Sequence, residues 1–290
     1  MDYTIDQFSK ITGLNKLLLR TWENRYNFLK AKRTSTNIRY YSDNLLICAL
    51  NTKFLIDSGY KISFIVKKSE SEINNLIDQI NDDGQAASPY NYYVNKFIES
   101  GVKFNTLLFN KTYNKCVLDF DNITLYKNIL LPTLNKIGMF WLTNRINPAQ
   151  EHFLSEMFKQ KIYKSIDDIN VKKNKLKTWL LFLPPNEYHE LGLLFTRLLL
   201  LHSGFNVIYL GANVPLKTLL EVSRNHTVDC TLFFSISNFS IGRLDETLDF
   251  LHNQFNMSTN YFVSRYNPVS LKGRPSVKFV NNLNEFIKVL

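Results

Sequence analysis

The sequence predicts a multidomain protein that is helical in its first two sections and α/β in its last. Its 290 residues suffice for two or three domains that each bury a core. Apolar residues recur with helical spacing up to about residue 170, and short apolar runs then alternate with helical patterns. We therefore expect three domains, at residues 1–75, 89–170 and 176–290.

Composition narrows the class of protein. Hydrophobic residues make up 45% and charged residues 21%, as in ordinary folded proteins, and the net charge of +10 favours a polyanionic partner such as nucleic acid. The first six residues lack the apolar segment of a secretory signal, and the apolar segment 191–201 is too short to span a bilayer. Three scattered cysteines suit neither a zinc site nor a disulfide framework: Cys48, Cys116 and Cys230. We expect reduced thiols in a cytoplasmic protein without a membrane partner.

The first section predicts two short helices joined by a turn. Residues 4–12 form the first helix, Gly13 supplies the turn, and Asn15 caps a second helix that runs to about Arg25. We expect a small core formed by Ile5, Phe8, Leu14, Leu18 and Trp22. The outer side of the second helix would carry Lys16, Arg20, Glu23 and Arg25. A helix-turn-helix presents such a helix to the major groove, with nearby cations on phosphates.

A basic hairpin is expected next, at residues 33–42, with Asn37 at its turn. The order Leu-Arg-Thr-Trp-Glu-Asn-Arg-Tyr at 19–26, then this hairpin, then a two-helix segment from Asp43, resembles the MerR family of winged helix-turn-helix regulators. Asn27 stands where the family usually has glycine, and Thr36-Asn37 replaces a glycine-rich wing turn. Asparagine tolerates the left-handed conformation better than most residues, so both changes are compatible with the fold.

The MerR resemblance implies a double-stranded DNA operator as partner. Its contacts would come from Lys16, Arg20, Arg25, Arg33, Arg39 and Tyr40. The alternative is that these basic residues form a solvated face and that the aromatic residues near them are ordinary core.

The middle section predicts a four-helix bundle. A polar linker at 81–89 precedes it, and loops are expected at Ser100-Gly101, near 114–121 and at 144–148. The last section then contains five apolar runs, which alternate with helical patterns at 179–183, 206–210, 229–235, 260–263 and 277–280. This alternation predicts right-handed βαβ units around a flavodoxin-like, or Rossmann-like, parallel sheet.

A histidine follows the first predicted strand of that sheet. Glu187, His189 and Gly192 form the pattern Asp/Glu-x-His-x-x-Gly, which resembles the cobalt-ligand loop of cobalamin-binding domains. Ligands of open α/β sheets gather at this carboxyl edge. The resemblance implies that His189 is the lower cobalt ligand, that Glu187 orients its ring, and that Gly192 leaves room for the nucleotide tail of the cofactor. The alternative is a surface histidine beside a strand end.

Later loops of the last section carry weaker signals of the same resemblance. Residues 211–215 resemble the family's usual second loop, Ser235 is a candidate contact to the tail, and Ser237 is a weaker one. The fourth loop departs from the pattern, because Ser264-Arg265 stands where cobalamin modules usually carry Gly-Gly. Side chains at these positions would crowd the tail.

The middle section resembles the cap over the upper face of the same cofactor. Trp141 is followed at the family's spacing by Glu151-His152, as in the adenosylcobalamin-dependent photoreceptor repressors of carotenoid genes, the CarH and LitR type. These three residues would face the corrin. Leu142 stands where light-responsive members commonly have histidine. The alternative is that the tryptophan packs in the bundle and that Glu151 and His152 are solvated.

Together these resemblances imply a transcriptional regulator and no enzyme. Its operator affinity and its dimeric or tetrameric state would depend on a bound cobalamin, either adenosylcobalamin or methylcobalamin, with a response to light. Two alternatives remain: a regulator with a degenerate pocket that acts through a protein partner, and a corrinoid carrier subunit of a methyltransferase. The sequence carries neither a phosphate-binding loop nor a nucleophile elbow.

Overall fold

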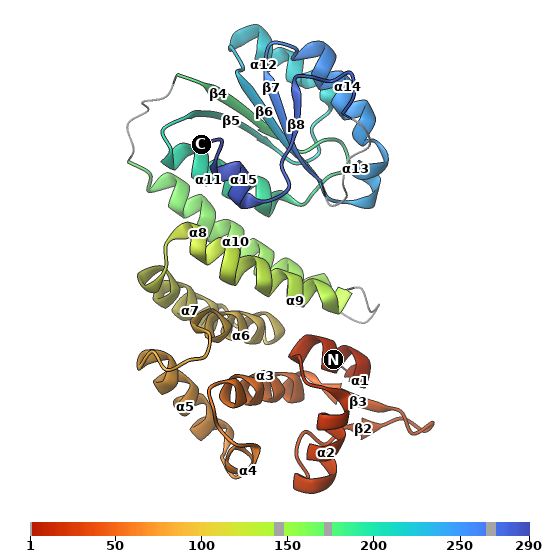
Figure 1. The fold of residues 1–290 in the computed structure, drawn as a ribbon, viewed down its shortest axis with the longest axis vertical. Helices are drawn as coiled ribbons and strands as arrows, with labels where there is room; N and C mark the ends of the chain where they lie inside the picture. Colours follow the sequence, from red (N-terminus) through yellow and green to blue (C-terminus); the bar gives the residue numbers. More distant parts are fainter. Residues whose placement is uncertain (1, 142–147, 171–175, 265–270) are drawn as a thin grey trace. The chain divides into compact units, whose positions relative to one another are not determined.

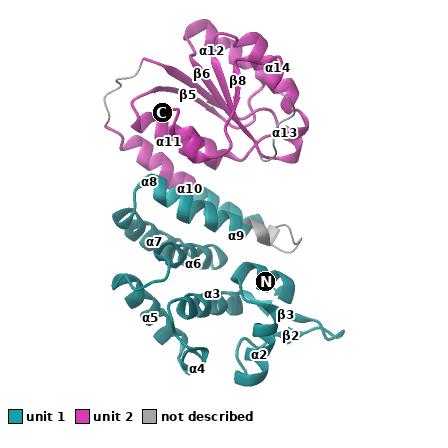
Figure 2. Ribbon diagram, viewed as in Figure 1, with its two compact units in different colours: residues 1–157 teal, residues 158–290 magenta. Residues whose placement is uncertain are grey.

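The computed structural model describes residues 2–141, 148–170, 176–264 and 271–290 (Figure 1). The chain divides into two compact units, residues 1–157 and 158–290 (Figure 2). The first unit holds helices and a small antiparallel sheet, and the second holds a five-stranded parallel sheet. The predicted fold class is therefore confirmed, while the division into three domains stays a prediction. Among the helices that the structure describes, none has the length and apolarity needed to cross a membrane.

The first unit begins with a helix-turn-helix and a hairpin. Its elements are β1 (Asp2–Thr4), α1 (Ile5–Thr12), α2 (Lys16–Tyr26), β2 (Lys32–Arg33) and β3 (Arg39–Ser42), with the strands in the order β1-β3-β2. Thr4 and Gln7 form a capping box at the start of α1, and Asn15 caps α2 through its side chain. Gly13 ends α1 with φ +70°, a conformation that favours glycine. The predicted helices, turn and hairpin are confirmed.

The core of this region differs from the prediction at one position. Phe8 and Trp22 are buried as expected, and Phe8 stacks on Tyr41 with ring centroids 4.1 Å apart. Leu18, however, is 38% exposed, and Leu19 is fully buried in its place. Leu19 and Trp22 lie three residues apart and share one face of α2, whereas Leu18 points to the side of that face. The expectation that Leu18 lies in the core was wrong.

Two asparagines that stand where the MerR resemblance has glycine adopt the left-handed backbone conformation. Asn27 ends α2 with φ +51°, and Asn37 has φ +62° at the tip of the hairpin. Both therefore occupy the left-handed region, where asparagine is more readily accommodated than other non-glycine residues. The replacement of glycine at these sites leaves the turns intact.

Further helices complete the first unit and reach into the second. They are α3 (Asp43–Asp57), α4 (Ile62–Ile65), α5 (Glu70–Asp82), α6 (Pro89–Val102), α7 (Thr106–Asp119), α8 (Asn122–Leu125), the π-helical turn η1 (Tyr126–Leu130), α9 (Leu131–Trp141) and α10 (Pro148–Asp167). The predicted four helices of the middle section are confirmed as α6, α7, the continuous α8–η1–α9 segment and α10.

Two of the expected loops in this section were wrong. Ser100 and Gly101 lie inside α6, and α7 continues to Asp119. A Cβ atom on Gly101 would lie 2.5 Å from the Leu154 side chain of α10, so the glycine permits close packing of two helices. The predicted loop at 144–148 falls largely on residues outside those described, and Pro148 begins α10.

The second unit is a parallel sheet with helices on both faces (Figure 1). Its elements are β4 (Thr178–Phe182), α11 (Glu190–His202), β5 (Asn206–Gly211), η2 (Leu216–Thr218), α12 (Leu219–Asn225), β6 (Cys230–Ser235), α13 (Asn238–Gly242), α14 (Leu244–Gln254), β7 (Thr259–Ser264), β8 (Val277–Phe279) and α15 (Leu283–Ile287). The strand order β5-β4-β6-β7-β8 is that of the flavodoxin-like fold. All five predicted strands are confirmed, and the order of the strands reverses between β4 and β6.

Alternation along the strands separates the two faces of this sheet. Phe182, Phe233 and Phe262 stack across adjacent strands with centroids 5.6 and 5.7 Å apart, in the cluster that includes α12 and α14. Trp179 stacks on Tyr261 on the opposite face, with centroids 5.2 Å apart. Because successive side chains of a strand point to opposite faces, this register fixes which residues of β6 face α11 at the carboxyl edge.

Candidate functional site

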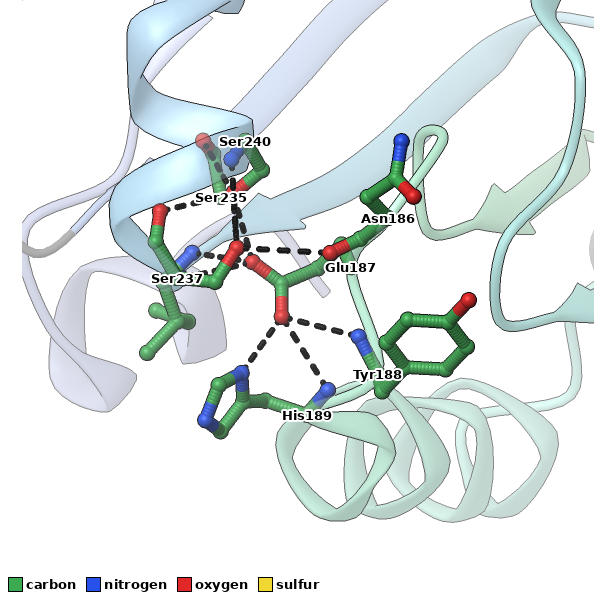
Figure 3. A network of polar contacts seen from close by, with 8 residues as sticks. Asn186, Glu187, Tyr188, His189, Ser235, Ser237 and Ser240 are labelled. Carbon is green, nitrogen blue, oxygen red and sulfur yellow. Dashed lines mark hydrogen bonds and ion pairs between the residues drawn. The ribbon is translucent and has the colours of Figure 1, made fainter.

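Glu187 is the centre of a hydrogen-bond network at the carboxyl edge of the sheet (Figure 3). Its side chain is fully buried. Oε1 accepts from the backbone N–H groups of Tyr188 and His189 at 3.0 and 3.1 Å, and lies 2.5 Å from Nδ1 of the His189 ring. Oε2 accepts from the backbone N–H groups of Ile236 and Ser237, both at 2.7 Å, and from Ser240 Oγ at 2.6 Å. Both oxygens are thus fully used.

This network keeps the carboxyl group ionised. Burial by itself would raise the pKa of Glu187, but the hydrogen bonds from His189, Ser240 and the two backbone amides outweigh it and lower the pKa. A carboxylate can only accept hydrogen bonds, so Nδ1 of His189 carries the proton that it shares with Oε1. In the neutral ring the lone pair then lies on Nε2, the nitrogen directed away from Glu187 (Figure 3).

His189 lies at the N-cap of α11 and its side chain is 60% exposed. The helix itself begins at the next residue, Glu190. The ring is held by a buried anion on one side and exposed on the other. This is the arrangement that proteins use to orient a metal-binding imidazole.

Three strand-end loops hold this site together. After β4, the N–H of Asn186 donates to Oδ1 of Asn213 in the loop after β5, at 2.9 Å. The N–H of Asn213 in turn donates to the carbonyl oxygen of Glu187 at 3.2 Å. The loop after β6 provides the donors to Oε2 of the same glutamate. Neighbouring strands thereby fix the position of His189 from both sides.

Sequence reasoning missed Ser240 and the two backbone amides before it. Ser240 is buried, and its hydroxyl group donates to Glu187. The hydroxyl oxygens of Ser235 and Ser240 lie 3.0 Å apart and are hydrogen-bonded. Ser235 therefore supports the network through Ser240, and Ser237 Oγ contacts Ser240 at 3.0 Å as well. The signal in the sequence was the serine-rich run at 235–240, but nothing in it identifies which serine meets a glutamate about fifty residues earlier.

Gly192 lies against a large side chain of the sheet. A Cβ atom at this position would lie 2.3 Å from Cε2 and 2.9 Å from Cδ2 of Phe234, the penultimate residue of β6. The ring of Phe234 therefore fills the space that the absent side chain leaves. The space expected for a nucleotide tail beside Gly192 is thus occupied by the protein itself, whereas His189, held by Glu187 and 60% exposed, has the donor chemistry of a metal ligand.

The predicted cap residues lie in the first unit. Trp141 is the last residue of α9, and its side chain and Leu142 lie outside what the structure describes. Glu151 and His152 are neighbours near the start of α10, with Oε2 of Glu151 4.0 Å from Nδ1 of His152. Glu151 also accepts from Ser155 Oγ at 2.5 Å, and His152 is 68% exposed. Their role toward a ligand stays a prediction.

The predicted DNA-contacting residues lie on α2 and the hairpin. Lys16 forms an ion pair with Asp6, Arg20 is exposed, and the Arg25 guanidinium lies over the ring of Tyr26 at 5.4 Å. All three basic residues are exposed, whereas Leu19 and Trp22 of the same helix are buried. Their contacts to DNA stay a prediction.

Arg33 and Arg39 connect the hairpin to α2 through one acidic residue. Arg39 Nε donates to Oε2 of Glu23 at 2.7 Å, and an Arg33 nitrogen lies 4.0 Å from Oε1 of the same carboxylate. Arg33 also donates to Oδ1 of Asn37 at 2.7 Å, which ties the wing turn to its own strand. Tyr40 beside Arg39 is half-buried. These contacts set the position of the wing relative to α2.

Two regions of the chain match known families of DNA-binding and ligand-binding domains. Residues 3–71 match the family model of MerR HTH family regulatory proteins, and residues 93–164 match that of the B12 binding domain. The chain therefore combines a MerR-type helix-turn-helix region with a B12-binding region.

The proteins that are similar to this chain include two transcriptional repressors and a corrinoid protein of known structure. The HTH-type transcriptional repressor CarH of Myxococcus xanthus is 26% identical over 220 residues, which cover 75% of this chain and 73% of that protein. The HTH-type transcriptional repressor CarA of the same organism is 23% identical over 221 residues, covering 76% and 71%. The monomethylamine corrinoid protein of Methanosarcina barkeri superposes with a TM-score of 0.55 at 15% identity, over 67% of this chain and 94% of that chain, and shows a shared fold.

Proposed function

We propose that this protein is a transcriptional regulator whose binding to an operator is controlled by a corrinoid held at His189. The observation that carries the proposal is the buried Glu187 carboxylate, which fixes the ring through Nδ1 and directs Nε2 outward. A bound cobalt ion would act as a Lewis acid toward the lone pair of this nitrogen. Glu187 and Ser240 keep the ring in the required tautomer, and the loops after β5 and β6 hold both in place.

The DNA half of the proposal rests on α2 and the hairpin. Their basic side chains would contact phosphates and base edges of a duplex, with Lys16, Arg20, Arg25, Arg33, Arg39 and Tyr40 as the contact residues. In this proposal Arg39 also has a positioning role, because its hydrogen bond to Glu23 holds the hairpin against α2.

Control by the corrinoid would work through assembly. We infer that adenosylcobalamin or methylcobalamin, covered by Trp141, Glu151 and His152, favours one dimeric or tetrameric arrangement, and that light acts by removing the upper axial group. Such control requires that the corrinoid bind the two assemblies with different affinity. The name repressor, borne by the two similar Myxococcus xanthus proteins, supports a repressor function here.

The test is corrinoid retention by the purified full-length chain. We expect the wild type, mixed with hydroxocobalamin in darkness, to keep the corrin absorption band through gel filtration. His189→Ala should lose the band, because the lower axial ligand is gone. His226→Ala, an exposed histidine at the end of α12, is the matched control and should keep it. Equal retention by both variants would refute the role of His189.

A second candidate function is a MerR-type regulator that acts through a protein partner without a corrinoid. The ring of Phe234 beside Gly192 favours it, because it fills space in the ligand-binding half. Operator binding that persists with an unchanged affinity and oligomeric state, whether or not a corrinoid is added, would select this candidate.

A further inference from the structure

Phe234 closes the side of the site that faces α11. Its ring atoms lie 2.3 and 2.9 Å from the position of a Cβ on Gly192, so the ring packs directly on the backbone of α11 two residues into that helix. Phe234 precedes Ser235, the last residue of β6. The two residues after the strand, Ile236 and Ser237, donate their N–H groups to Glu187. The phenyl ring is therefore part of the same structure that orients His189.

The opposite side of the loop is closed as well. Ser235, Ser240 and the carboxylate of Glu187 are all buried, and they are bonded to one another rather than arranged around a space. Beyond them lies a cavity of about 230 Å³, lined by Pro184, Pro185 and Arg243 among others. This volume is below the range of about 300–1,000 Å³ that is usual for ligand pockets.

A cobalamin that takes His189 as its lower ligand needs room for its displaced nucleotide. The tail hangs from the same face of the corrin that the histidine approaches, so the bulky base must enter the protein beside the His189 loop. Both sides of that loop are filled among the described residues, by Phe234 on one side and by the serine–glutamate network on the other. The corrin ring itself meets neither obstacle, since His189 is exposed at the edge.

We propose that this site recognises the corrin ring and its cobalt but not the nucleotide tail, and that Phe234 sets this specificity. The ligand class is corrinoids, with those that lack the base bound at least as well as cobalamin. The inference rests on the proposed function, because it requires that His189 binds cobalt. The substitution Phe234→Ala, which replaces the benzyl side chain with a methyl group, opens the space beside Gly192 and makes room for a base.

The experiment compares two corrinoids on three full-length proteins. Wild type, Phe234→Ala and the control Phe250→Ala are titrated with hydroxocobalamin and with diaquocobinamide, which has the ring but no base. Phe250 is a half-buried ring in the core cluster on the other face of the sheet, so its loss tests for general weakening of the unit. Thermal unfolding shows whether each variant is folded. Phe234→Leu, a smaller change at the same position, serves as the variant to titrate if Phe234→Ala does not fold.

We expect the wild type to bind cobinamide at least as tightly as cobalamin. Phe234→Ala should bind cobalamin about tenfold more tightly, a change of about 1.4 kcal/mol, with cobinamide affinity unchanged. Phe250→Ala should leave the preference between the two corrinoids unaltered. A wild type that prefers cobalamin tenfold or more, with no effect of Phe234→Ala, overturns the inference while the proposed function stands. Binding of neither corrinoid, by any of the proteins, removes both.

Discussion

Replacing Glu187 with glutamine tests whether this carboxylate organises the edge of the sheet. The carboxylate accepts from four backbone N–H groups, two at each oxygen, as well as from His189 and Ser240. A glutamine places an NH₂ group at one of the two positions, so two part-buried backbone donors lose their acceptor in either orientation. Each unsatisfied donor costs about 1–3 kcal/mol, and relief from burying a charge offsets part of this. The free energy that holds this network closed should therefore fall by about 2–4 kcal/mol.

Hydrogen exchange of the loops after β4 and β6 is the direct assay. A loss of about 2–4 kcal/mol corresponds to about 30- to 1,000-fold faster exchange of the amide pair that loses its acceptor, either Tyr188 and His189 or Ile236 and Ser237, provided that they exchange through local opening. Glu221→Gln is the matched control, since the Glu221 side chain is 66% exposed and forms a surface ion pair with Arg224 of the same helix. That variant should leave the exchange unchanged. If none of these amides exchanges faster in Glu187→Gln than in the wild type, the account of the network is refuted.

Four further predictions concern acid, the turn after α2 and, in two cases, the DNA surface. The pKa of Glu187 is lowered by folding, so its contribution to stability is present above the unfolded value of about 4.3 and is lost as the pH falls below it; urea titrations should show a smaller acid-induced loss in Glu187→Gln. Asn27→Ala should lower stability by about 1 kcal/mol in the same titrations, and Asn27→Gly should not, because φ is +51°. Arg20→Ala should weaken duplex binding and reduce the slope of log affinity against log salt by about 1. Glu23→Gln should weaken binding too, although it removes a negative charge, because it releases Arg39; tighter binding would contradict that role.

The sequence predicted what depends on local spacing. The five strands and the helices of the bundle follow from periodicity, and the contact between Glu187 and His189 joins residues two positions apart. It did not predict Ser240, because the bond to Glu187 spans 53 residues and depends on where two strands end in space. The error at Leu18 has a different cause, since a shift of one residue in helical phase exchanges a buried leucine for an exposed one.

Glycine was the residue type that sequence reasoning interpreted least well. Gly101 was expected in a loop and instead lets α6 approach Leu154 of α10, and Gly192 was expected to make room for a ligand and instead receives the ring of Phe234. In both cases the missing side chain is replaced by a neighbour that is distant in sequence. A glycine in a ligand-binding pattern shows only that a side chain is not tolerated there, and the structure decides whether protein or ligand fills the space. For Gly192 the size of residue 234 makes that decision, so the ligand specificity of this site depends on a residue outside the motif that identifies it.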